Sequence, residues 1–263
     1  MSNNSEKPLA GKWFVVIGAA GKLGPIWCSA IIDAGGKVIA MGINSTTDLD
    51  LLKIYKDKPD QILLIDQDIT TELNQNSIDS LNSAKISGVV LNAGIDSIPG
   101  AGYSDITKFD YDFWQRILGT NVAGVASILN HLIPLLGVDS SVVFIGSMYA
   151  VVAPTPSLYS HYNSGAGSVK NPAYAASKAA LISICNQYAT HFGNSGIRFN
   201  LLTLGGIEGN QDDEFKAKFK AKVPLARMGQ ASEIGDSLIF LLSSQSSYMT
   251  GQNLILDGGY TKW

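Results

Sequence analysis

A tyrosine and a lysine four residues apart, Tyr174 and Lys178, are well suited to move a proton. On a helix, this spacing places the phenol and the ammonium group on one face. A fixed positive charge beside a phenol favours the phenolate and lowers the pKa of the phenol, so Tyr174 can serve as a general acid or base for an alcohol or a ketone. The same spacing often arises by chance, and the pair carries weight only if other groups lie beside it.

Two polar side chains from other segments are candidates to act with this pair. Ser147 follows the apolar run 141–145, which predicts its position at the carboxyl end of a strand, where ligands bind in open α/β sheets. Asn121 lies within a stretch of helical period, where an asparagine without a partner is mildly unfavourable. A surface or capping role is the alternative for Asn121.

A glycine-rich turn after the apolar run 13–17 offers a phosphate site. Glycine allows the backbone to turn tightly and to approach a diphosphate closely, while the following helix N-terminus attracts its negative charge. The position after the first strand favours a dinucleotide over an ordinary strand-to-helix turn. The contacts expected in this turn are Gly18, Gly21, Lys22, Leu23 and Gly24.

The end of the second expected strand bears on the choice between the two nicotinamide cofactors. An acid there would bind the adenine ribose and repel a 2′-phosphate, but this chain carries Asn44. Lys22, Ser45 and Thr46 offer a cation and two hydroxyls to a 2′-phosphate, although no arginine accompanies them. We therefore favour NADP and leave NAD open. The other expected cofactor contacts are Asp68, Ile69, Asn92, Ala93, Gly94 and Ile207.

Short apolar runs alternate with longer stretches of helical period along the chain. This alternation predicts βαβ units, in which helices cover both faces of a parallel sheet. We expect one doubly wound α/β Rossmann domain over residues 1–263, with a mainly parallel sheet of about seven strands. The expected strands are 13–17, 37–41, 61–65, 87–91, 141–145, 198–203 and 253–256, and the long helices are 108–136 and 173–193.

An irregular segment, 152–171, begins a few residues after Ser147 and ends before Tyr174. Because both of its ends adjoin candidate catalytic groups, we expect it to form a wall of the substrate pocket, with a solvent-facing loop as the alternative. Its polar side chains suit a polyhydroxylated small molecule better than an acyl chain. They are Tyr159, His161, Tyr162, Asn163 and Ser164.

A second irregular segment, 205–223, contains a lysine-rich stretch with Phe215 and Phe219 four residues apart. This pattern predicts an amphipathic surface helix, with a flap over the site as the alternative.

Composition narrows the possible partners. The formal net charge is −3, which leaves no basic excess for a nucleic acid. The apolar runs are too short to span a bilayer and the N-terminus lacks a signal-peptide core, so we expect a cytoplasmic protein without a membrane partner. Cys28 and Cys185 lie in apolar helical patterns, and with only three histidines we expect no metal site.

Taken together, these features resemble the single-domain branch of the short-chain dehydrogenase/reductase (SDR) family over nearly the whole chain. The resemblance rests on the glycine turn, the residues named above after each strand, and the tail that ends in Asp257-Gly258-Gly259. It implies an enzyme that transfers hydride between a nicotinamide cofactor and a secondary alcohol or ketone. It also implies a homodimer or homotetramer built on the two long helices.

The resemblance assigns a role to each member of a catalytic tetrad. Tyr174 would transfer the proton, and Ser147 would hydrogen-bond the reacting oxygen. Lys178 would hold the nicotinamide ribose and lower the pKa of Tyr174, while Asn121 would position a water in a proton relay.

Departures from the family pattern keep other possibilities open. The glycine spacing G-x-x-G-x-x-G is typical of the longer sugar-nucleotide epimerase branch, and Leu91 and Leu204 replace a usual Asn and Pro. The doubled interval between Ser147 and Tyr174 is similar to SDR enzymes of nonulosonic-acid and surface-sugar biosynthesis. The alternatives are a non-catalytic nucleotide-binding regulator or scaffold with this fold, and an epimerase or dehydratase.

Overall fold

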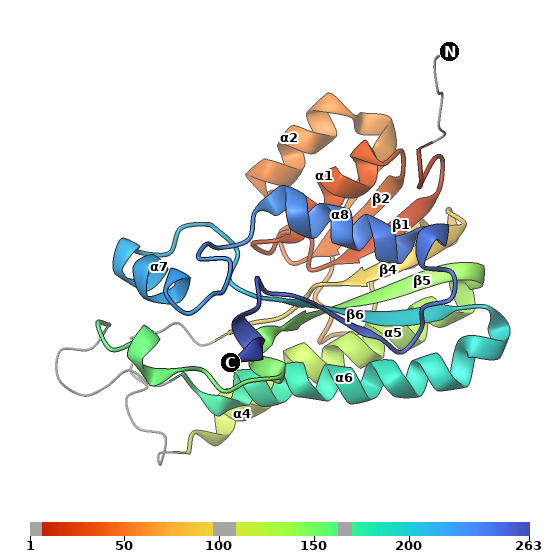
Figure 1. Cartoon of the computed structure of the whole chain (residues 1–263). Coiled ribbons are helices and arrows are strands. Elements are labelled where there is room, and N and C mark those ends of the chain that lie inside the picture. Colours follow the sequence, from red (N-terminus) through yellow and green to blue (C-terminus); the bar gives the residue numbers. More distant parts are fainter. Residues whose placement is uncertain (1–6, 97–108, 163–169) are drawn as a thin grey trace.

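The computed structural model describes residues 7–96, 109–162 and 170–263 (Figure 1). Seven strands in this part of the chain form one sheet in the order β3-β2-β1-β4-β5-β6-β7, and every neighbouring pair is parallel. The predicted doubly wound α/β fold is confirmed. The strands are β1 Trp13–Ile17, β2 Lys37–Gly42, β3 Ile62–Asp66, β4 Ile86–Leu91, β5 Leu136–Ser147, β6 Arg198–Leu204 and β7 Asn253–Leu256.

The strand β5 is the one whose start differs most from the prediction. It begins at Leu136, which pairs with Ile86, and the register then shifts before Ser141 pairs with Gly88. Residues 137–139, which lie between these two pairs, are exposed. They therefore carry no apolar pattern from which a strand could be predicted.

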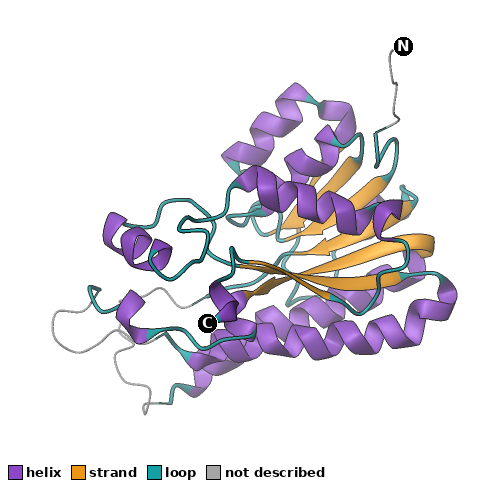
Figure 2. Ribbon diagram, in the orientation of Figure 1, coloured by secondary structure: helices purple, strands orange, loops and turns teal. Residues whose placement is uncertain are grey.

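Helices cover both faces of the sheet in two layers (Figure 2). Trp27, Ile31 and Leu238 belong to a buried cluster on one face, and Leu129 and Leu181 to a cluster on the other. Figure 1 shows α1, α2 and α8 above the sheet and α4, α5 and α6 below it. The helices are α1 Gly24–Asp33, α2 Leu49–Asp57, α3 Gln75–Asn82, α4 Tyr111–Leu118, α5 Val125–Leu132, α6 Pro172–Phe192, α7 Asp213–Lys220 and α8 Ala231–Leu242.

The long helix predicted over 108–136 is interrupted by a π-helical turn at Gly119–Gly124, between α4 and α5. By length and composition alone, the combined stretch Tyr111–Leu135 could cross a membrane. Its side chains Val125 and Ile128 instead pack into the cluster beneath the sheet, as expected of a core helix.

The segment 205–223 contains the predicted amphipathic helix, α7, whose first turn is capped by the carboxylate of Asp212. Phe219 is buried in a third apolar cluster, which also contains Tyr149, Tyr159 and Tyr260. This cluster joins α7 to the segment after β5 and to the C-terminus, and Figure 1 shows α7 beside the carboxyl ends of the strands.

Candidate active site

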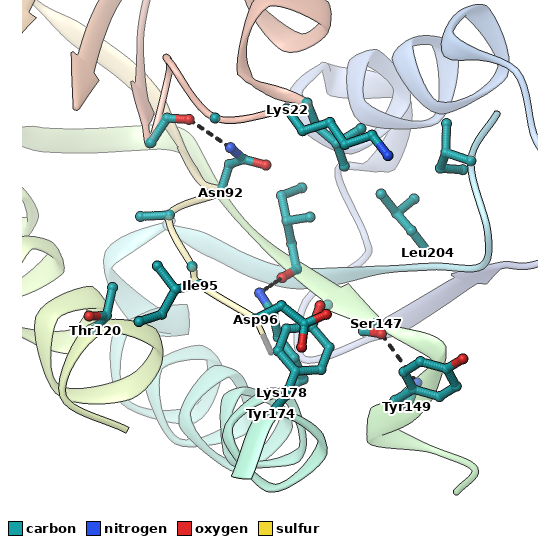
Figure 3. Close-up of a pocket in the computed structure, with 18 of the residues that line it drawn as sticks. Lys22, Asn92, Ile95, Asp96, Thr120, Ser147, Tyr149, Tyr174, Lys178 and Leu204 are labelled. Atoms are coloured by element: carbon teal, nitrogen blue, oxygen red, sulfur yellow. Dashed lines mark hydrogen bonds between the residues drawn. The ribbon is translucent and has the colours of Figure 1, made fainter. Parts of the chain in front are cut away.

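A cleft of about 1030 Å³ lies at the carboxyl ends of the strands, beside the point between β1 and β4 where the strand order reverses. Open α/β sheets bind ligands at this switch point. The glycine turn after β1 lines one end, and Ser147, Tyr174 and Lys178 line the other (Figure 3). All the expected cofactor contacts except Gly24 line the same cleft, including Asn44, Asp68, Ile69, Ala93, Gly94 and Ile207.

The glycine turn is held close to the end of β4. Gly18 has a φ of +78°, and a Cβ built on it would lie 2.6 Å from the backbone of Ala93. Gly24 does not line the cleft, because its role is packing: a Cβ there would lie 1.9 Å from the Ala19 carbonyl oxygen. Glycine is thus required at both positions for close approach of the backbone.

The N-terminus of α1 is prepared for an anion. No side chain among the described residues caps it, and its N-cap residue is Leu23. The Gly24 N–H donates to the Gly21 carbonyl oxygen (2.8 Å) and Pro25 has no N–H, so the features that fit the diphosphate of a dinucleotide are the positive end of the helix and the close approach that the glycines allow. The residues present therefore fit a nicotinamide dinucleotide.

The adenosine end of the cleft differs in part from the prediction. Asn44 lines the cleft with a φ of +62°. The buried Ser45 hydroxyl donates to the Gly42 carbonyl oxygen (3.2 Å), and the Thr46 hydroxyl donates to the Asp66 carboxylate. Both hydroxyls therefore have partners within the protein, and neither lines the cleft where a 2′-phosphate was expected to meet them.

Lys22 reaches across the cleft rather than toward the adenosine end. A Cβ built on Gly209 would lie 3.1 Å from the Lys22 Nζ atom, so this ammonium group lies against the segment that follows β6. Figure 3 shows the Lys22 side chain extended in the direction of Leu204. The cation therefore lies near Gly209, in the segment 205–223.

The start of α6 positions Tyr174. Asn171 caps the helix by accepting a hydrogen bond from the Ala173 N–H (2.8 Å), and Pro172 occupies the first turn. Tyr174 thereby lies at the cleft in the first turn of the helix, where Ser147 at the end of β5 lines the same cleft and lowers the pKa of the phenol. The Ser147 hydroxyl itself accepts a hydrogen bond from the Tyr149 N–H (3.3 Å). Lys178, one turn later, is buried and donates from Nζ to the Ile145 carbonyl oxygen (3.0 Å).

The electrostatics of this pair differ from the prediction. Burial raises the pKa of Tyr174, the Asp96 charge raises it further, and Ser147 lowers it. Burial also lowers the pKa of Lys178 to about 8. The expectation that Lys178 lowers the pKa of Tyr174 toward neutrality is not met, because the ammonium lies 5.9 Å from the ring centre and shares the same desolvated environment.

Asn121 is fully buried in the π-helical turn, so the alternative prediction, in which Asn121 lies at the surface, is wrong. Its Nδ2 donates to the Ile95 carbonyl (2.9 Å) and to the Ser177 hydroxyl (3.0 Å), and its Oδ1 accepts from the Ile95 N–H (2.8 Å). Through Asn121, these bonds connect Ile95, in the segment after β4, to Ser177 on α6. Gly94, the residue before Ile95, lies close to the side chains of Lys178 and Asn121. π-Helical turns inside α-helices are frequent at functional sites.

The segment 152–171 contributes Tyr159, Tyr162 and Lys170 to the lining of the cleft. The His161 side chain is directed to α7, where Nε2 lies 3.0 Å from Asp212, and Tyr162 also donates to Asp212. Asn163 and Ser164, which were expected at the ligand, lie outside the described residues.

The cleft residues that were not predicted from the sequence include Asp96, Tyr149 and Lys170. Asp96 and Tyr149 each follow a predicted site residue, Gly94 and Ser147, by two positions. That proximity to a strand end was the available signal. Lys170 lies in the segment 152–171, which was predicted to line the pocket, but nothing in the sequence singled it out within that segment.

Comparison with known proteins agrees with this geometry. Residues 18–261 match a family model described as enoyl-(acyl carrier protein) reductase. An uncharacterised short-chain type dehydrogenase/reductase from Sinorhizobium fredii is 27% identical over 260 residues, 95% of this chain, and the chain spans 44% of the length of that relative.

Two solved structures share the fold. A short-chain dehydrogenase from Leptospira borgpetersenii with bound NAD+ has a TM-score of 0.80 at 24% identity, covering 99% of this chain and 97% of that one. A gluconate 5-dehydrogenase from Burkholderia cenocepacia in complex with NADP and tartrate has a TM-score of 0.77 at 22% identity, covering 98% of both chains. These likenesses show the fold, and the match of residues 18–261 to the family model shows that the chain belongs to the short-chain dehydrogenase/reductase family of NAD(P)-dependent oxidoreductases.

Proposed function

We propose that this enzyme interconverts a secondary alcohol and a ketone on a polar small molecule, with Tyr174 as the general acid or base. The observation that carries the proposal is that Ser147 and Tyr174 line the same cleft, with Lys178 one helical turn after Tyr174 on α6. A substrate oxygen placed between the two hydroxyls would receive two hydrogen bonds, and the phenol could exchange a proton with it.

Each of the remaining tetrad residues has a supporting role in this proposal. A bound nicotinamide would supply or accept the hydride. Lys178 would hold the cofactor ribose from its buried position beside Gly94. Asn121 would fix the backbone of Ile95 beside the reacting groups, and its link to Ser177 ties that backbone to the helix bearing Tyr174.

The hydroxyl groups of Ser147 and Tyr174 could also stabilise the charge that develops on the reacting oxygen. A developing alkoxide is stabilised by hydrogen-bond donors, which Ser147 and Tyr174 provide in the cleft. The raised pKa of Tyr174 keeps the phenol protonated, which suits donation of a proton to the oxygen of a ketone. In the reverse reaction, oxidation of an alcohol, the same oxygen of Tyr174 would take the proton back.

For the cofactor, we retain NADP(H) as the preferred partner and NAD(H) as the alternative. The support is Asn44 at the end of β2, which brings no negative charge to oppose a 2′-phosphate. Fluorescence titration of the enzyme with NADPH and with NADH tests this preference. A lower dissociation constant for NADH would reverse it, and Asn44→Asp should then move the enzyme further toward NADH.

For assembly, we propose a homodimer or homotetramer in the cytoplasm. The support is the outer face of α6, where the exposed residues Ala176, Ala179 and Ser183 are small and follow helical spacing. Small residues allow close packing of a second copy about a two-fold axis, which is the commonest symmetry of homo-oligomers.

The decisive test of the activity is a substrate panel with purified enzyme. Hydroxylated and keto compounds, including sugars, sugar acids and sugar nucleotides, are each incubated with either cofactor, and turnover is followed by nicotinamide absorbance. The proposal expects turnover of at least one polar compound that depends on Tyr174. Turnover that survives in Tyr174→Phe at the wild-type rate would reject the assigned chemistry.

A further inference from the structure

Two oppositely charged side chains outside the tetrad, Asp96 and Lys170, form an ion pair at the cleft beside Tyr174. Asp96 follows β4 by a few residues, and Lys170 lies directly before α6. Figure 3 shows Asp96 next to Tyr174 and Lys178. Moving an ion pair out of water costs free energy, so an ion pair placed here is poorly explained by stability alone.

The two partners differ in their access to a ligand. The Lys170 side chain is 8% exposed, whereas that of Asp96 is 38% exposed. The Lys170 ammonium lies 5.1 Å from the ring centre of Tyr174, 5.4 Å from that of Tyr149 and 5.7 Å from that of Tyr159. Three aromatic rings and a carboxylate thus enclose this cation. Lys170 is therefore suited to hold Asp96 in place, and Asp96 to meet a ligand.

The Asp96 carboxylate also lies within electrostatic range of both reacting groups. Its charge raises the pKa of Tyr174, and it opposes the lowering of the pKa of Lys178 by burial. Since charge interactions weaken with distance, these two effects support a position beside the bound substrate. The carboxylate therefore lies in the same part of the cleft as Tyr174 and Lys178.

We propose that Asp96 determines substrate specificity by accepting a hydrogen bond from a hydroxyl or amino group on the carbon next to the reacting one, and that Lys170 positions it. The inference rests on the proposed function and names its substrate class: vicinal diols and amino alcohols, as found in polyhydroxylated molecules. An ionised carboxylate can only accept hydrogen bonds, so the substrate must donate. A substrate carboxylate at the same place would be repelled, and an alkyl chain would displace water from the carboxylate without offering a donor in return.

The test compares two probes that differ by one hydroxyl, trans-cyclohexane-1,2-diol and cyclohexanol. Binding of each probe to the enzyme saturated with NADPH is measured by calorimetry, which requires no turnover. A hydrogen bond to a charged acceptor should make the diol bind about ten- to a hundred-fold more tightly than cyclohexanol. Asp96→Leu, which removes the acceptor at similar size, should abolish this preference. Equal affinities in the wild type, failure of both probes to bind, or a preference that survives Asp96→Leu would each overturn the proposal.

A double-mutant cycle tests whether Lys170 acts through Asp96. Lys170→Met should reduce the preference for the diol, but it should add nothing to Asp96→Leu, because the residue that it positions is already absent. Lys218→Met is the matched control. Lys218 lies on α7 and contacts Ser160 of the segment 152–171 and Glu214 of α7, but it does not pair with Asp96. Additive losses from Asp96→Leu and Lys170→Met, or an equal loss in the control, would show that Lys170 is only structural.

The failure of this inference can be distinguished from failure of the proposed function. Tyr174→Phe should abolish turnover while preserving the binding preference for the diol, because the acceptor remains. Loss of preference in Asp96→Leu together with persistent turnover in Tyr174→Phe would leave the specificity role standing and reject the role of Tyr174.

Discussion

The side chain of Asn92 donates a hydrogen bond from Nδ2 to the carbonyl oxygen of Gly18, over 2.8 Å. Its Oδ1 accepts a second bond from the indole Nε1 of Trp27, over 2.9 Å. One amide at the end of β4 therefore fixes both the glycine turn and the helix that follows it. The backbone of the glycine turn is thus held in its conformation by the protein itself.

Asn92→Ala should weaken both the fold and cofactor binding. It leaves the Trp27 N–H and the Gly18 carbonyl without their partner, and each such loss costs about 1–3 kcal/mol when the group is shielded from water. Thermal unfolding and cofactor titration provide the measurement. Asn92→Asp is the control, since it can still accept from Trp27 but cannot donate to Gly18. An unchanged dissociation constant in both variants would show that the glycine turn does not depend on this bond.

Gly18→Ala should destabilise the protein more than the same change at another glycine of similar φ. The added methyl would lie 2.6 Å from the Ala93 backbone, in addition to the strain at a φ of +78°. Gly11→Ala is the matched control, because Gly11 has a φ of +70° but no heavy atom within 4 Å of the added Cβ. Positive φ alone costs about 1–2 kcal/mol. Denaturation of both variants should show a clear excess at Gly18, and equal losses would contradict the close approach of the two segments.

The burial of Lys178 predicts a stability change with pH. The pKa of Lys178 is lowered from 10.5 to about 8 in the folded protein. Below pH 8 the lysine is protonated in both states, and the folded state bears the cost of the buried charge. Between about pH 8 and 10.5 the folded state releases the proton first, so stability rises with pH by on the order of 3 kcal/mol in total.

Lys178→Met removes this dependence and provides the measurement. The free energy of unfolding of the wild type relative to the variant should rise as the pH increases from 8 to 10.5. The variant should also bind the cofactor more weakly, because it lacks the ammonium proposed to hold the ribose. A wild-type stability that falls relative to the variant over this pH range would mean that Lys178 is not desolvated as described.

Much of the fold was predictable because its signals are local. The run 13–17 coincides with β1, because a strand buried on both faces consists almost wholly of apolar residues. The run 253–256 coincides with β7, an edge strand that is only partly buried. The exposed start of β5 lacked such a signal. The π-helical turn at Asn121 was also missed, because it differs from an α-helix by one backbone register and leaves the apolar period nearly intact.

The candidate site was predictable only where it adjoins strand ends. Several predicted site residues lie at the last position of a strand or directly after it, as do Gly18, Asn92 and Ser147. Parallel topology brings the carboxyl ends of the strands to one edge of the sheet. The roles expected of Ser45, Thr46 and Lys22 depended on side-chain directions, which no sequence pattern fixes. Likewise, the pairing of Lys170 with Asp96 joins residues 74 positions apart through the path of a loop.

Association of the chain into a dimer or tetramer should depend on the small residues along the outer face of α6. Ala179→Arg places a long charged side chain on this face and should dissociate the assembly, whereas Lys218→Arg on α7 should not. Native mass spectrometry of the wild type and both variants measures the mass directly. A wild-type monomer at micromolar concentration would refute the proposed assembly.

The most direct test of the account is a single-turnover measurement on Tyr174→Phe with a substrate identified from the panel. The change removes the phenol hydroxyl and keeps the ring, so cofactor affinity should stay within a few-fold of the wild type while hydride transfer slows by about 10²–10⁴-fold. Tyr188→Phe, on the outer part of the same helix with its hydroxyl bonded to Asn130, is the control and should transfer hydride at the normal rate. A transfer rate for Tyr174→Phe within a few-fold of the wild type would contradict the assignment of Tyr174 as the group that moves the proton.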